Sequence, residues 1–211
     1  MTQGIDVSHI QGSIDWLAAK TVGAINFAFI KASEGVGYHD SMFVQNWTQA
    51  KAAGVFPGAY HFFHPEQDAQ AQAECFLRAL AQANGNTTLQ PGCLPCVLDV
   101  EKVNGCTPEL IAARVNQWLD TVETATGVAP IIYTGWGYWN AAVAPAMPLP
   151  AHLLWVAEYG VSNPRLPIGF LEWTFWQNGQ AGKVAGVPGQ VDTDVFNGAQ
   201  SDLAALARCQ A

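Results

Sequence analysis

Short runs of apolar, β-branched and aromatic residues recur along the chain and are separated by more polar segments. Runs of about four to eight such residues, bounded by turn-forming residues, are typical of buried strands. Eight segments have this pattern: residues 4–8, 25–33, 58–63, 96–101, 130–135, 153–159, 174–178 and 191–196. We therefore expect eight strands.

Three segments between the early strands have apolar residues at helical spacing: residues 40–54, 68–85 and 107–127. The last has the clearest ends, because Thr107 is a favoured capping residue, Pro108 suits the first helical position and Gly127 can end the helix. Beyond residue 136 the helical segments become short, and the pattern predicts only one further helix at residues 199–210.

The alternation of strands and helices predicts βα units and a parallel sheet. Eight strands favour a barrel, but a full eightfold (β/α) barrel usually takes about 250 residues. The sequence therefore predicts an α/β fold, a trimmed TIM-like barrel without its later helices. No low-complexity tract or linker interrupts the chain, so we expect residues 1–211 to form a single domain.

The charge and composition of the chain argue against some classes of binding partner. The net charge is −8 and the pI is near 4.9, whereas nucleic acids and anionic membranes select Lys/Arg patches. No run of roughly 18 apolar residues would span a membrane, and the first ten residues do not resemble a signal peptide. We expect a monomer that binds neither nucleic acid nor membrane.

The chain has five cysteines: Cys75, Cys93, Cys96, Cys106 and Cys209. The CLPC segment resembles half of a zinc site, but no second ligand pair has suitable spacing, so we expect neither a metal nor a cofactor. In an oxidising compartment, Cys93 or Cys96 could form a bridge to Cys106. Buried free thiols are the alternative.

Carboxylates occur where strands are expected to end. Asp99 and Glu101 are one residue apart in VLDVE, so their side chains share one face, with Cα atoms about 6.6–7 Å apart. Asp6 lies in the first predicted strand and Asp192 in the last, and these strands become neighbours if the sheet closes. Four carboxylates would then meet at one end of the barrel. Such crowding raises at least one pKa and leaves a protonated acid beside an ionised partner.

A protonated acid beside a carboxylate is the working pair of glycoside hydrolysis. Clustered carboxylates also bind Mg²⁺ or Ca²⁺, and a solvated strand end with Lys102 as partner is a third interpretation. Aromatic residues near the predicted strand ends favour a sugar: Tyr60, Phe62, Tyr133, Trp136, Trp155, Tyr159 and Trp176. His61 lies in an apolar run and is interpreted as a hydrogen-bonded core residue rather than as a base.

Several segments together resemble the glycoside hydrolase family 25 muramidases, lysozymes of Chalaropsis type. The similar segments run in family order from Gly4 to about Gly198: GIDVSHIQGSIDW, FAFIKASEG, DSMFVQNWTQAKAAGVFPGAYHFF, VLDVE, IIYTGWGYW, LWVAEYG, FWQ and VDTDVFNG. The resemblance implies a flattened barrel of five β/α units plus three further strands. It also implies hydrolysis of the β-1,4 bond between N-acetylmuramic acid and N-acetylglucosamine in peptidoglycan, outside the cytoplasm and with retention.

By the same resemblance Glu101 corresponds to the proton donor. Asp99 corresponds to its partner, either as nucleophile or as the group that orients a substrate acetamido group, and Asp6 and Asp192 flank the pair. Candidate substrate-binding residues are Tyr60, Phe62, Tyr133, Trp155, Gln177 and Glu34, although a supporting polar role is an equal alternative for Glu34.

Two alternatives stay open. Asp194 stands where relatives often carry Asn, so a fifth carboxylate either lies near the site or points away from it; Asp192 is preferred because it matches the family position. The second alternative is a glycan-binding module on the same barrel whose carboxylates no longer catalyse. No wall-binding module is expected in the chain beyond the barrel.

Overall fold

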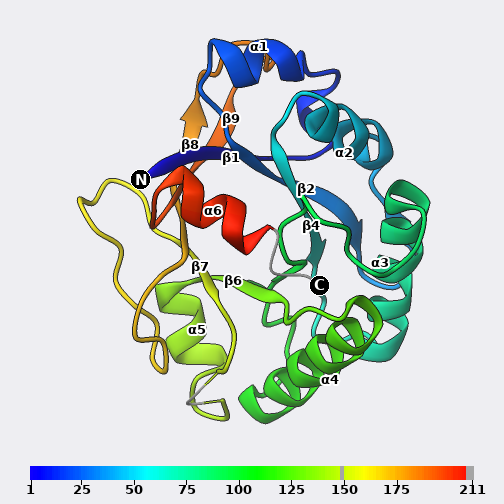
Figure 1. Ribbon diagram of the computed structural model, residues 1–211. Coiled ribbons are helices and arrows are strands. Elements are labelled where there is room, and N and C mark those ends of the chain that lie inside the picture. Colours follow the sequence, from blue (N-terminus) through cyan, green and yellow to red (C-terminus); the bar gives the residue numbers. More distant parts are fainter. Residues whose placement is uncertain (148–149, 208–211) are drawn as a thin grey trace.

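The computed structural model describes residues 1–147 and 150–207 (Figure 1). Its strands are β1 (Thr2–Val7), β2 (Phe27–Glu34), β3 (Tyr38–His39), β4 (Phe56–Phe62), β5 (Val97–Asp99), β6 (Ile131–Gly135), β7 (Leu154–Ala157), β8 (Phe175–Gly182) and β9 (Val191–Phe196). Its helices are α1 (Trp16–Thr21), α2 (Phe43–Ala52), α3 (Ala69–Asn84), α4 (Pro108–Thr126), α5 (Trp136–Ala142) and α6 (Gln200–Leu206), with a 3₁₀ turn at His9–Gln11.

The sheet closes on itself. Its strands follow the order β1-β9-β8-β7-β6-β5-β4-β2-β3, and an additional pairing of β1 with β2 completes a barrel that leaves β3 outside. Neighbouring barrel strands are parallel except at β9, which is antiparallel to β1 and to β8. Five β/α units precede β7, β8 and β9. The predicted trimmed barrel, with its first and last strands side by side, is confirmed.

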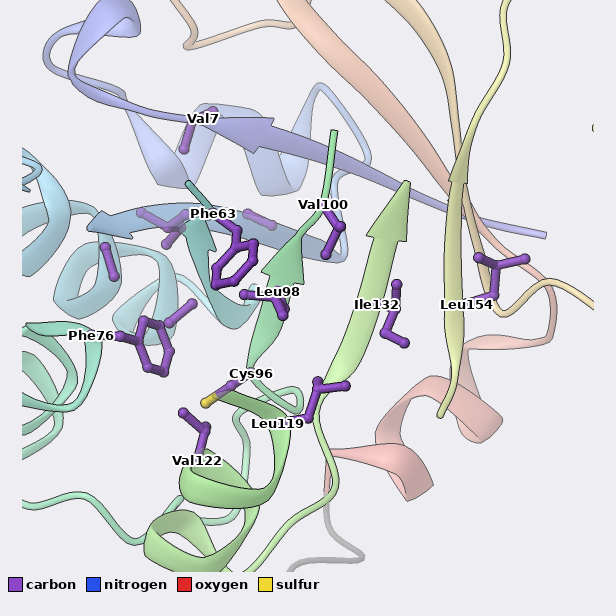
Figure 2. Packing of buried hydrophobic residues seen from close by; sticks show 14 of the residues in the cluster. Val7, Phe63, Phe76, Cys96, Leu98, Val100, Leu119, Val122, Ile132 and Leu154 are labelled. Carbon is purple, nitrogen blue, oxygen red and sulfur yellow. The ribbon is translucent and has the colours of Figure 1, made fainter. Parts of the chain in front are cut away.

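Side chains alternate between two packed layers along each barrel strand. On β5, Leu98 belongs to a cluster between the barrel and its helices, together with Leu119 of α4 and Ile132 of β6 (Figure 2). Val97 belongs instead to a cluster inside the barrel, which contains many aromatic rings. Asp99, two residues after Val97, therefore points to the inside of the barrel.

The long helices have the predicted ends. The Thr107 side chain accepts a hydrogen bond from the Leu110 amide, Pro108 begins α4, and Gly127 ends it with a φ of 77°. The sequence pattern missed the short elements β3, α1 and α5, because two to seven residues carry too little periodicity. The helix predicted at 199–210 is observed over Gln200–Leu206, and residues 208–211 lie outside the described part.

Helix α6 closes one end of the barrel (Figure 1). Leu203 and Ala207 are buried in the inner cluster, and the carbonyl of Ala207 accepts a hydrogen bond from the Gly92 amide, which lies ahead of β5 in the chain. This is the end where the parallel strands begin. The predicted carboxylates are therefore expected at the opposite end of the barrel, where the parallel strands finish.

Cys75, Cys93, Cys96 and Cys106 are free thiols, so of the two alternatives the structure has the free thiols and no bridge from Cys93 or Cys96 to Cys106. Cys93 and Cys96 lie before β5, whereas Cys106 follows it and precedes α4, so the strand separates them. Cys209 lies outside the described residues. Among the helices of residues 1–147 and 150–207, none is long and apolar enough to cross a membrane.

Candidate active site

A cavity of about 290 Å³ lies where the parallel strands finish. Four carboxylates from three strand ends line it: Asp6, Asp99, Glu101 and Asp192. The structure therefore brings together all four acids that the sequence singled out, although they are as far as 186 positions apart along the chain. Barrel closure is the cause, since it places β9 beside β1.

Backbone hydrogen bonds hold the segment that carries Asp99 and Glu101. The Asp99 carbonyl accepts from the Phe63 amide at 3.0 Å, and the Val100 amide donates to the Tyr133 carbonyl at 2.9 Å. Strand β5 ends at Asp99, so the prediction that it reaches residue 101 is wrong. Glu101 lies just beyond the strand and is exposed as a residue, but its carboxyl group is partly buried and lines the same cavity as the buried Asp99.

Asp6 and Asp192 lie directly opposite each other in the β1–β9 register. Gln177 of β8 bridges them, because its Nε2 donates to Asp6 Oδ2 at 2.6 Å and lies 3.5 Å from Asp192 Oδ2. Its Oε1 accepts hydrogen bonds from the hydroxyl groups of Tyr133 and Tyr159. The amide of Gln177 is thereby fixed with its donor toward the acids.

Burial raises the pKa of every acid in the cavity, and neighbouring carboxylates add to the rise at Asp6 and Asp99. Burial, then the charge of Asp192, raises the pKa of Asp6 from 3.8 to about 7. Burial, then the charges of Glu101 and Asp6, raises the pKa of Asp99 well above its usual value. Burial also raises the pKa of Glu101 and of Asp192. The site can therefore retain protons at mildly acidic to neutral pH.

Five of the six candidate substrate-binding residues line the acidic cavity: Tyr60, Phe62, Tyr133, Trp155 and Gln177. Tyr159 joins them. Glu34 does not line this cavity and lies in a neighbouring one. Trp136 and Trp176 are also elsewhere: Trp136 lies under the Arg165 guanidinium, and Trp176 is buried with its Nε1 donating to the Glu158 carbonyl.

Asp194 and His61 lie behind the cavity walls. Asp194 is fully buried, and its Oδ1 accepts a hydrogen bond from Trp155 Nε1 at 2.8 Å. Burial, then the charge of Asp6, raises the pKa of Asp194 well above its usual value, and the fifth carboxyl group lies beneath the site and not in it. His61 is buried between Ser33 and Gln72, and burial lowers its pKa to about 3, which confirms its assignment as a core residue.

The sequence did not single out four residues of the cavity wall: Ser8, His9, Ile10 and Lys31. Ser8 caps the 3₁₀ turn that follows β1, and this turn carries the next two residues to the cavity edge. The only sign in the sequence that this turn lies at the cavity was the position of Ser8, two residues after Asp6 in DVSHI. Lys31, the one lysine or arginine in the described wall, lies within an apolar strand, where only the closed barrel shows which way it points.

A comparison with known protein families identifies the family to which this chain is similar. The family model described as "Glycosyl hydrolases family 25" matches residues 5–187. The chain belongs to this family. It is therefore a glycoside hydrolase with an α/β barrel.

Individual relatives support the assignment. A protein named "Lysozyme M1" from Streptomyces globisporus is 40% identical over 97% of this chain and 71% of its own length. The "N,O-diacetylmuramidase" of Chalaropsis sp is 30% identical over 97% of this chain and 98% of its own. The crystal structure of a bacterial lysozyme from Streptomyces coelicolor superimposes with a TM-score of 0.89 and 39% identity, covering 100% of this chain and 98% of that one.

Proposed function

We propose that this family 25 member is a muramidase that hydrolyses the β-1,4 bond between N-acetylmuramic acid and N-acetylglucosamine in peptidoglycan, outside the cytoplasm. The observation that carries the proposal is the Asp99–Glu101 pair in a cavity lined by aromatic rings. Sugars pack on such rings, and a pair of acids at one bond is what glycoside hydrolysis requires. The names of the relatives, lysozyme and N,O-diacetylmuramidase, agree with this substrate.

Glu101 is assigned as the proton donor. Its raised pKa keeps a fraction of the side chain protonated at mildly acidic pH, and its exposed position beyond β5 leaves the carboxyl group accessible to a bound sugar. Lys31 and Lys102 oppose this rise, because their positive charges favour the ionised form that follows proton transfer.

Asp99 is assigned as the group that orients the substrate's acetamido group. It is buried, and its Oδ1 has no hydrogen-bond partner among the described residues. A buried oxygen without a donor costs free energy, and an amide N–H of the substrate would satisfy it. Asp6 and Asp192, linked by Gln177, form the opposite wall of the cavity.

These assignments favour hydrolysis with retention through the substrate itself. The acetamido oxygen attacks the anomeric carbon, the bond to the leaving oxygen breaks, and that oxygen takes the proton of Glu101. Water then opens the cyclic intermediate and gives a proton back to Glu101. Two displacements retain the configuration, and no short carboxyl–carboxyl distance is needed.

Proton NMR of a reaction in progress tests the stereochemistry. The first-formed reducing end is expected to be the β-anomer, and its appearance before mutarotation would support retention. An initial α-anomer would contradict retention. A glycosyl ester trapped on Asp99 would leave retention intact but exclude the substrate-assisted path.

Replacement of the proton donor tests the function. Glu101→Gln keeps the shape of the side chain but cannot donate the acidic proton, so turnover of purified peptidoglycan should fall about 10²–10⁴-fold. Turbidity loss and mass spectrometry of the products measure turnover and identify the bond cut, and sedimentation with cell walls measures binding. Near-normal turnover by the variant would contradict the assignment. Wall binding without hydrolysis by the unmodified protein would instead favour a glycan-binding module.

A further inference from the structure

A second cavity, of about 580 Å³, adjoins the acidic one. His9 and Lys31 line both cavities, so the two share a wall. The second cavity is bounded further by the loop at residues 35–37, by Tyr38 of β3 and by Gln67. A substrate bound at the four acids therefore has a roomy space immediately beside it.

One wall of the second cavity is a fixed set of charges. Glu34 accepts hydrogen bonds from Lys31 Nζ at 2.6 Å and from His64 Nε2 at 2.9 Å. Burial opposes ionisation of Glu34, but these two hydrogen bonds outweigh it and lower its pKa. Lys31 also lies over the Phe62 ring, 4.8 Å from its centroid. These contacts fix both a carboxylate and an ammonium group at the cavity wall.

The wall of the second cavity also contains a histidine in a set orientation. Asp40 Oδ2 accepts hydrogen bonds from the backbone amide of His9 at 3.0 Å and from its Nδ1 at 2.8 Å. The Asp40 side chain is itself fully buried. Since Nδ1 is engaged with Asp40, the other ring nitrogen of His9 is left for a ligand.

The two cavities differ in chemistry. The acidic cavity presents five aromatic side chains, which suit the faces of sugar rings: Tyr60, Phe62, Tyr133, Trp155 and Tyr159. The second cavity has one phenol ring, that of Tyr38, and one aliphatic side chain, that of Val36; its other side chains are charged groups, imidazoles and an amide. Such a wall recognises charged and amide groups better than it recognises a sugar face.

We propose that the second cavity binds the peptide stem attached to the muramic acid residue beside the cleaved bond. This proposal rests on the proposed muramidase function. A stem peptide brings carboxylates, amides and, at a diamino residue, an ammonium group. Lys31 offers a donor to the carboxylates, His9 Nε2 offers an acceptor to an amide N–H, and Glu34 offers an acceptor to the ammonium group. The cavity thus distinguishes peptide-bearing wall from bare glycan.

The test compares two substrates: glycan strands with their stems, and the same strands after an amidase has removed the stems. The variant is Gly37→Trp. Gly37 lines the second cavity and has no positive φ, and a Cβ there would meet nothing within 4 Å, so a large side chain can be added without backbone strain. Leu17→Trp on α1 is the matched control, because Leu17 is 64% exposed and lies in neither cavity.

The unmodified enzyme should have a lower KM for stem-bearing strands than for stripped ones. Gly37→Trp should raise KM for stem-bearing strands about tenfold, as expected for the loss of about 1.4 kcal/mol of binding, with kcat and the stripped-strand KM nearly unchanged. His64→Ala, which removes a hydrogen bond that holds Glu34 rather than filling the space, should act in the same direction. Leu17→Trp should change KM for neither substrate.

Three results would overturn the proposal. Equal KM values of the unmodified enzyme for both substrates would show that no stem is bound. An equal loss on both substrates in Gly37→Trp would assign the cavity to a further sugar residue. If the unmodified enzyme cleaves neither substrate, the proposed muramidase function is wrong as well. The first two results contradict only the stem-binding proposal, because in both of them the enzyme still cleaves the glycan.

Discussion

Asp6 shows how a single residue links the site to stability. Burial and the charge of Asp192 raise its pKa from 3.8 to about 7, so the folded protein favours the protonated form more than the unfolded chain does. For a raised pKa the stabilising contribution is complete below pH 4 and is lost as the pH rises toward 7. Each unit of pKa difference corresponds to about 1.4 kcal/mol.

Asp6→Asn should therefore become progressively more stable than the unmodified protein between pH 4 and pH 7, with little further change above about pH 8. The amide cannot ionise, and its oxygen can accept the hydrogen bond that Gln177 now donates to Asp6. Thermal unfolding followed by circular dichroism across this range measures the difference in Tm. Asp120→Asn, at an exposed position of α4, is the control. A Tm difference that does not vary with pH would contradict the assigned pKa.

For single residues, the sequence predicts which side chains line the site better than it predicts the contacts that they make. Strand alternation and the family motifs are enough to point to Asp99 and Asp6. The bridge by Gln177 and the burial of Asp194 depend on the register between β8, β9 and β1, which the hydrophobic pattern does not encode. Lys31 was missed because a charged residue in an apolar strand gives no sign of which cavity it faces.

At the scale of elements, the short helix α5 supports the segment that carries Glu101. The hydroxyl of Tyr138 on α5 donates a hydrogen bond to the Lys102 carbonyl at 2.6 Å. Lys102 directly follows Glu101 beyond the end of β5, where no further ladder holds the chain. This hydrogen bond therefore restricts the position of the proposed proton donor.

Tyr138→Phe should lower kcat several-fold, because a proton donor displaced by even 1 Å acts less efficiently, and should cost about 1 kcal/mol of stability. Steady-state kinetics and thermal unfolding measure the two effects. Thr48→Val is the control, since it removes a hydrogen bond of similar length to the Val44 carbonyl on the distant surface of α2. Equal kcat values for the two variants would show that α5 does not position Glu101.

Helix α5 also marks the limit of prediction from sequence patterns. Helix α4 has nineteen residues, a capping threonine and a terminal glycine, and the pattern located it within one residue at each end. Helices α1 and α5 have six and seven residues, and their positions are set by packing against the barrel rather than by their own periodicity. The part of the fold that holds Glu101 is thus the part that the sequence describes least well.

At the scale of the whole molecule, the barrel has one end for chemistry and one for stability. Leu203 of α6 is fully buried in the inner cluster, at the end opposite the acids. Leu203→Ala should cost about 2–5 kcal/mol of unfolding free energy through lost burial and a cavity, while kcat at low temperature stays the same. Urea unfolding and peptidoglycan turnover measure these effects. Leu110→Ala, at a 40% exposed position, should cost much less. A large loss of turnover in Leu203→Ala would show that the two ends are coupled.

The closure of the barrel also determines when the acidic cavity can be completed during synthesis on the ribosome. Strand β1 is translated before every other strand of the described barrel, yet one of its two neighbours, β9, is the last of these strands to be made. The early β/α units can form while the chain grows, but β1 and β8 keep unpaired edges until residues 191–196 have emerged. Asp6 and Gln177 then gain Asp192 as a partner. A nascent chain therefore carries Asp99 and Glu101 long before it has a complete acidic cavity, so the proposed muramidase activity is expected only after β9 has emerged and closed the barrel.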